Sequence, residues 1–78
     1  MIFLLEYDRR RGKLLTFKRF SDSERPAAAA ARLKLELSRR GAATPPEIVL
    51  LEAETEDALR RTHRRYFQTV REIIDASF

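Results

Sequence analysis

The chain has no cysteine, no tryptophan and only two glycines. The lack of cysteine excludes disulfides, thiolate-ligated zinc or iron–sulfur sites, and a catalytic cysteine–histidine pair. A small domain without disulfides fits a reducing compartment. Two glycines are too few for the glycine-rich loops that hold nucleotide phosphates. Disulfide scaffolds, cysteine metal sites and glycine-rich nucleotide sites are therefore not expected.

The sequence also lacks a long hydrophobic run. The apolar N-terminal stretch MIFLL is too short for a signal peptide and has no basic region before it. No segment is long enough to cross a membrane. We therefore expect a cytoplasmic protein that has no membrane partner.

The 78 residues suffice for one domain, residues 1–78, with a net charge of +4 and a pI near 10.1. Almost all of the basic charge is arginine, with only three lysines. A basic protein of this kind can bind nucleic acid. GC-rich codon usage, which favours arginine and alanine, explains the same excess, so the charge alone carries limited weight.

Three segments are predicted to be strands. Residues 2–8 and 13–20 are rich in β-branched and aromatic residues, and the turn between them contains Gly12, which tolerates positive φ. These two strands form a hairpin. Residues 47–54 contain four consecutive large apolar residues, which indicates a strand buried on both faces.

Residues 23–40 are predicted to form a helix. Five consecutive alanines favour helix, Ser23 can cap its start, and Arg39, Arg40 and Gly41 are typical of a helix end. At helical spacing Leu33 and Leu37 share one face with Ala30. Leu35 points roughly the other way, where it is either exposed or in a contact.

Residues 56–76 are predicted to form a second helix, capped by Thr55. At helical spacing seven residues form an apolar arc: Leu59, His63, Tyr66, Phe67, Val70, Ile73 and Ile74. Charged and polar residues, among them five arginines, fill the opposite arc. The last turns of this long helix can overhang the sheet and touch a partner.

The expected fold is a small two-layer α+β domain of order β-β-α-β-α. A right-handed crossover places residues 2–8 in the middle of a three-stranded, mostly antiparallel sheet, with both helices on one face. Residues 2–5 and 48–51 supply apolar side chains to both faces, so one apolar face would remain open. A homodimer or a protein partner is predicted to cover that face.

Arginines are concentrated in the second helix. Glu56–Arg60 and Asp57–Arg61 are favourable pairs four residues apart, whereas Arg64 and Arg65 have no acidic residue at that spacing. These two can pair with strand carboxylates such as Glu52 or Glu54, or contact phosphates. The candidate nucleic-acid-binding residues are the following: Arg60, Arg61, Arg64, Arg65, Arg9, Arg10 and Arg11. No known base-reading motif accompanies them, so any such binding would be electrostatic and salt-sensitive.

Catalytic chemistry has little support. His63, the only histidine, lies on the apolar arc and is predicted to be structural. Glu6 and Asp8 in one strand and Glu52 and Glu54 in another could hold Mg²⁺ only if the strands were parallel neighbours. We predict no catalytic, cofactor-binding or metal-binding residue.

The sequence therefore predicts a small, non-enzymatic binding or interaction module without a cofactor. We expect it to dimerise through an apolar sheet face or through the C-terminal helix. The alternative is a nucleic-acid-binding accessory protein that uses the arginine-rich helix and the hairpin turn.

Overall fold

The computed structural model describes residues 1–67. Its strands are β1 (Ile2–Asp8), β2 (Lys13–Phe20) and β3 (Glu47–Glu52). Its helices are α1 (Arg25–Ser38) and α2 (Glu56–Thr62), with the 3₁₀ turns η1 (Asp22–Glu24) and η2 (Arg64–Tyr66). All three predicted strands are present, and β3 ends two residues before the predicted limit. No helix within residues 1–67 is long and apolar enough to cross a membrane.

The sheet has the predicted order β2-β1-β3, and both strand pairs are antiparallel. Gly12 in the hairpin turn has a φ of 64°, the left-handed conformation that glycine adopts without steric cost. A bulge between Glu6 and Tyr7 interrupts the β1–β2 register. The α+β class and the strand order predicted from the sequence are confirmed.

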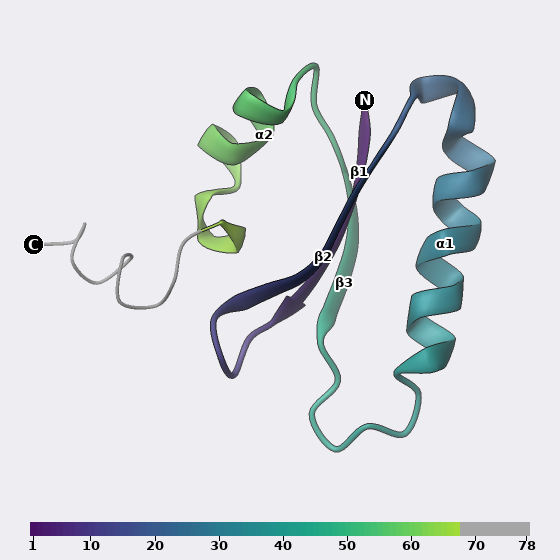
Figure 1. The fold of residues 1–78 in the computed structure, drawn as a ribbon, viewed down its shortest axis with the longest axis vertical. Helices are drawn as coiled ribbons and strands as arrows, with labels where there is room; N and C mark the ends of the chain where they lie inside the picture. The colour runs from purple at the N-terminus through teal and green to yellow at the C-terminus, as the bar shows by residue number, and fades with distance from the viewer. Residues whose placement is uncertain (68–78) are drawn as a thin grey trace, which may run out of the picture.

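The prediction that both helices lie on one face is wrong. Figure 1 shows α1 and α2 on opposite sides of the sheet. Phe3, Leu5 and Tyr7 of β1 pack in one cluster with Leu59 of α2 and Tyr66 of η2. The alternate side chains of β1 point to the other face, under α1. Both faces of the sheet carry apolar side chains, and each face is covered by one helix.

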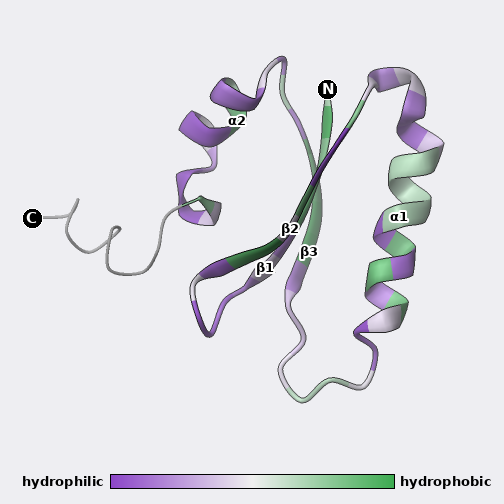
Figure 2. Ribbon diagram, viewed as in Figure 1, coloured by the Kyte–Doolittle hydropathy of each residue, from purple (hydrophilic) through white to green (hydrophobic). Residues whose placement is uncertain are grey.

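This arrangement buries the central strand on both faces. The side chains of Ile2, Phe3, Leu4 and Leu5 are at most 1% exposed. Apolar residues are concentrated in the strands and polar ones in α2 and the hairpin turn (Figure 2). The apolar sheet face, one of the two surfaces through which the chain was predicted to dimerise, is thus covered within the chain.

Helix α1 faces the sheet with the side of Leu35, for which the sequence left exposure or a contact open, and not with the side of Leu33 and Leu37. Ala28 is buried and Leu35 is half-buried, whereas Leu33 and Leu37 are each 56% exposed. The buried side carries Arg39 just beyond the last turn, and its Nε donates to the fully buried Glu6 at 2.5 Å. Burying this carboxylate without a partner would be costly, so the ion pair favours this rotation over one that buries the leucines.

The start of α1 also differs in detail. The Glu24 carboxylate accepts hydrogen bonds from the Ser21 backbone N–H at 2.9 Å and from its hydroxyl at 3.0 Å. These bonds lower the pKa of Glu24. The 3₁₀ turn η1 therefore begins after Ser21, two residues before the predicted cap at Ser23, and leads into α1 with Pro26 in its first turn.

The second helix is shorter than the predicted span 56–76. Thr55 caps α2 as predicted and accepts from the Ala58 N–H at 3.0 Å. The helix ends at Thr62 because His63 has φ −126° and ψ 51°, outside the helical region. The turn that follows directs Tyr66 onto Tyr7, with the two ring centroids 5.3 Å apart. The rest of the predicted helix, from residue 68, lies outside the described residues.

Candidate interaction surfaces

Glu47, the first residue of β3, accepts hydrogen bonds from two of the candidate arginines and from Tyr66. Arg65 donates to its two oxygens at 3.0 and 3.2 Å, Arg9 at 3.4 Å and the Tyr66 hydroxyl at 3.0 Å. The Arg65 guanidinium also lies 4.2 Å above the Tyr66 ring. Arg65 thus pairs with a strand carboxylate, which was one of its two predicted roles. The acid is Glu47 and not Glu52 or Glu54.

These contacts change the acidity of the groups involved. Burial raises the pKa of Glu47, but the hydrogen bonds from Arg65, Tyr66 and Arg9 outweigh it, and the pKa falls below its ordinary value. Burial, followed by the bond to Glu47, raises the pKa of Tyr66. The Glu47 cluster therefore consists of a carboxylate, a neutral phenol and two guanidinium groups at neutral pH. Its hydrogen bonds connect the hairpin and η2 to β3.

Arg60 and Arg11 are also partnered. Arg60 donates to Glu56 at 3.0 Å, which confirms one predicted pair, and its guanidinium lies 4.4 Å from the centre of the Phe67 ring. Arg11 lies 3.7 Å from Asp8. Both arginines line one hollow of about 370 Å³ between the hairpin turn and the α2–η2 segment. The structure therefore brings one candidate arginine of the hairpin turn and one of α2 to the same hollow.

Three candidate arginines remain without a carboxylate within 4.0 Å in the described part of the chain: Arg10, Arg61 and Arg64. Four of the seven predicted nucleic-acid-binding residues thus form ion pairs with carboxylates of the same chain. The positive charge that remains for a phosphate is smaller than the sequence indicates.

The structure shows where the histidine and the strand carboxylates weighed for catalysis or metal binding lie. The His63 Nδ1 lies 2.9 Å from the Thr62 hydroxyl, and the backbone N–H of His63 donates to the Leu59 carbonyl. Glu6 lies opposite Ile48, and Glu52 opposite Ile2, at different ends of the β1–β3 pair. No group of three or more acidic or histidine side chains that could hold a metal ion occurs within residues 1–67.

The outer edge of β3 was not among the surfaces predicted from the sequence. The Ala53 N–H donates to the Met1 carbonyl at 3.1 Å, so β3 bonds to β1 through Ala53 and, by alternation, through Leu51, Val49 and Glu47. The intervening residues are Ile48, Leu50 and Glu52. Their N–H and C=O groups point away from β1, along an edge that no other strand covers in the described part of the chain.

The two edges of the sheet differ in their protection against strand addition. Charged side chains lie within β2 at Lys18 and Arg19, and charged side chains on an edge discourage pairing with another strand. In β3 the charges are confined to the two ends, Glu47 and Glu52, with only apolar residues between them. The edge of β3 is therefore the one open to another strand.

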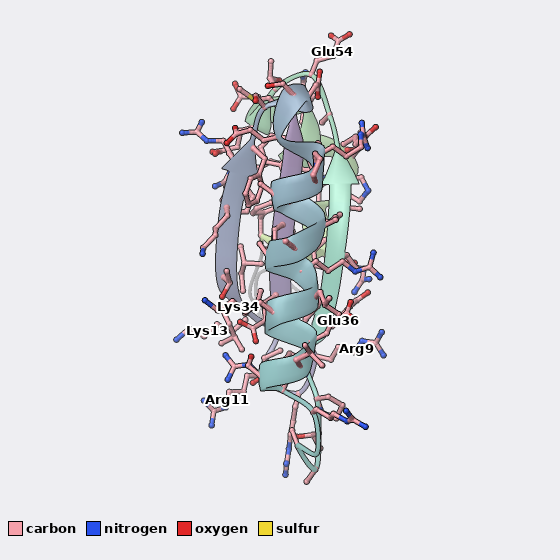
Figure 3. The ribbon with its side chains drawn as sticks, turned by 90° about the vertical axis from the view of Figure 1, so that its right-hand side faces the viewer. Arg9, Arg11, Lys13, Lys34, Glu36 and Glu54 are labelled. Carbon is pink, nitrogen blue, oxygen red and sulfur yellow. The ribbon has the colours of Figure 1, made fainter. Side chains whose placement is uncertain are left out.

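Two hollows lie beside this edge, on the α1 face of the sheet. One, of about 240 Å³, is lined by Ala29, Arg32, Leu33, Glu36 and Leu50. The other, of about 360 Å³, is lined by Glu36, Arg39, Arg40, Gly41, Pro45, Pro46 and Ile48. Figure 3 shows Glu36 on the β3 side of α1 and Lys34 on the opposite side.

The hollows follow the period of a strand. One lies at Leu50 and the other at Ile48, two residues along β3 on the same face. Side chains of a neighbouring strand that point to this face would be spaced by the same two residues. The direction of the backbone groups alternates along a strand, but the outward set in EIVLLE could be identified only once β3 and its pairing with β1 were known.

No family model, curated protein or solved structure matches this chain.

Proposed function

We propose that this protein is a non-enzymatic protein-interaction module that binds an extended strand along the outer edge of β3. The observation that carries the proposal is the outward set of backbone groups at Ile48, Leu50 and Glu52, beside two hollows at matching spacing. In strand addition, main-chain hydrogen bonds supply affinity and pockets for alternate side chains supply specificity.

The hollows define the chemistry of the strand. Leu33 and Leu50 line the smaller hollow and favour an apolar side chain. Arg40 lines the larger one and has no carboxylate within 4.0 Å among residues 1–67, whereas its neighbour Arg39 is held by Glu6. An antiparallel strand, followed from its N-terminus to its C-terminus, passes Leu50 before it passes Ile48. The expected recognition sequence is therefore an apolar residue followed two positions later by an acid.

A labelled peptide tests this proposal. The peptide TVTLTETV presents leucine and glutamate at the required spacing, and TVTLTKTV replaces the acid by lysine. We expect fluorescence anisotropy to show binding of the first peptide in the high micromolar range and about fivefold weaker binding of the second, since exposed ion pairs contribute up to about 1 kcal/mol. Equal binding of both peptides, or of neither, would contradict the proposed specificity.

A pair of matched variants locates the binding site. Leu50→Lys places a charge in the middle of the β3 edge, and Leu15→Lys makes the same change at a leucine of β2 that is 44% exposed. Circular dichroism verifies that both variants are folded. We expect only Leu50→Lys to abolish binding of TVTLTETV, and loss in both variants would remove the β3 edge from the proposal.

Nucleic-acid binding is the second candidate function, and the three arginines that have no carboxylate within 4.0 Å among residues 1–67 support it. The substitution of Arg10, Arg61 and Arg64 by alanine should then reduce binding of generic DNA or RNA and make its salt dependence shallower. The control replaces Arg9, Arg60 and Arg65, which hold carboxylates. Absence of nucleic-acid binding by the unmodified protein at low salt would dispose of this candidate.

A further inference from the structure

We infer that the strand bound at this edge is β3 of a second copy, paired antiparallel about a two-fold axis at Leu50. This inference rests on the proposed function and identifies the partner. It joins the two three-stranded sheets into one, with both α1 helices on the same face.

The direction of the side chains limits the possible registers. In an antiparallel pair, residues opposite each other point to the same face of the sheet. Two copies of β3 related by a two-fold axis must then pair about a residue and not between residues. The axis can pass through Val49, Leu50 or Leu51 near the middle of the strand.

Hydrogen bonding selects among these three registers. With the axis at Leu50, Ile48 faces Glu52 of the second copy, and every outward N–H and C=O of β3 has a partner. With the axis at Val49, Glu52 faces Pro46, which has no N–H. With the axis at Leu51, Ile48 faces residue 54, beyond the end of the strand. Only the Leu50 register pairs every outward N–H and C=O group of β3 with a residue that is itself in β3.

The same register gives the side chains complementary partners. The two Leu50 side chains face each other beside the smaller hollow of each copy, and Val49 faces Leu51 on the α2 face. Glu52 of each copy meets the larger hollow at Ile48, where Arg40 has no carboxylate among the described residues. In its own chain Glu52 contacts Arg25 with both side chains more than half exposed, so a second arginine can approach it.

The symmetry of the contact makes it testable by charge reversal. The dimer contains the Arg40–Glu52 contact twice. Arg40→Glu places two glutamates at each contact, and Glu52→Arg places two arginines there. A heterodimer of the two variants contains one glutamate and one arginine at each contact, so attraction is restored. Lys34→Glu is the matched control, because it makes the same charge change on the β2 side of α1, away from the proposed contact (Figure 3).

Sedimentation equilibrium of the full chain provides the measurement. We expect a reversible dimer for the unmodified protein, and at least about tenfold weaker association for Arg40→Glu and for Glu52→Arg alone. The equimolar mixture of the two variants should return to about the original affinity, and Lys34→Glu should leave it unchanged. A monomer at every concentration, or a mixture as weak as either variant, would overturn the inference.

Failure of the inference can be told from failure of the proposed function. A protein that remains monomeric but binds TVTLTETV at the β3 edge retains the strand-binding function and lacks the second copy as its partner. A protein that neither dimerises nor binds the peptide loses both.

Discussion

Replacement of Glu6 by glutamine tests the central ion pair of the fold. The Glu6 carboxylate is fully buried and accepts from Arg39 Nε at 2.5 Å and from the Thr16 hydroxyl at 2.7 Å. Glutamine keeps the shape but removes the charge, and in one of its two orientations its amide directs an N–H at the guanidinium. Glu6→Gln therefore weakens the contact without creating a cavity.

The expected loss of stability follows from this geometry. A hydrogen bond to a charged group contributes about 1.5–3 kcal/mol, and solvent reduces this value because the Arg39 side chain is 45% exposed. We expect Glu6→Gln to lower the free energy of unfolding by about 2 kcal/mol, equivalent to a fall in Tm of roughly 8–16 °C for a domain of this size. Urea denaturation at neutral pH measures the change.

The loss should also depend on pH. The hydrogen bond from Arg39 lowers the pKa of Glu6 in the folded state, and it outweighs burial, which acts in the opposite direction. The ionised carboxylate thus stabilises the fold above the unfolded pKa, near 4.3, and this contribution is lost as the pH falls through the lowered folded pKa. The difference between the unmodified chain and Glu6→Gln should shrink below about pH 4.

Glu36→Gln is the matched control. Glu36 contacts Arg32 at 2.7 Å on the surface of α1, with both side chains more than 40% exposed, so its loss should cost less than about 0.5 kcal/mol. Equal effects of the two substitutions, or a Glu6→Gln effect that does not vary with pH, would refute the argument that the buried ion pair sets the rotation of α1.

Further predictions concern the two helices. Leu35→Ala should lower the free energy of unfolding by about 1–2 kcal/mol, whereas Leu33→Ala, at an exposed position, should change it by less than about 0.5 kcal/mol; the reverse order in urea denaturation would contradict the rotation of α1. Thr55→Ala removes the acceptor for the Ala58 N–H and should cost about 1 kcal/mol, while Thr55→Ser should retain most of it. Thermal unfolding compares these two variants, and equal stability would show that the cap contributes nothing.

Much of the fold could be predicted because the strands have strong local signals. Alternating or continuous apolar residues and the turn at Gly12 defined β1, β2 and the start of β3, and the antiparallel order followed from the crossover rule. The position of the helices could not be derived in the same way. The apolar residues of β1 indicate that both faces need cover, but they do not say whether a helix of the same chain or a partner supplies it.

The errors within the helices arise from tertiary contacts. Helical spacing groups Leu33 with Leu37, but the choice of the buried side depends on Arg39 reaching Glu6, a carboxylate 33 residues earlier. Periodicity likewise continues through His63, but the backbone leaves the helical region there, and Tyr66 packs on Tyr7. The partner of Arg65 depends on this break, so the arginines could be listed from the sequence but their partners could not.

Amide hydrogen exchange along β3, measured by NMR at several protein concentrations, shows whether the β3 edge pairs with a second copy. Val49 and Leu51 bond to β1, so their amides should be protected at every concentration. The amides of Ile48, Leu50 and Glu52 should exchange quickly in dilute solution and become protected as the concentration rises. Fast exchange of these three amides at all concentrations would contradict self-association through the β3 edge.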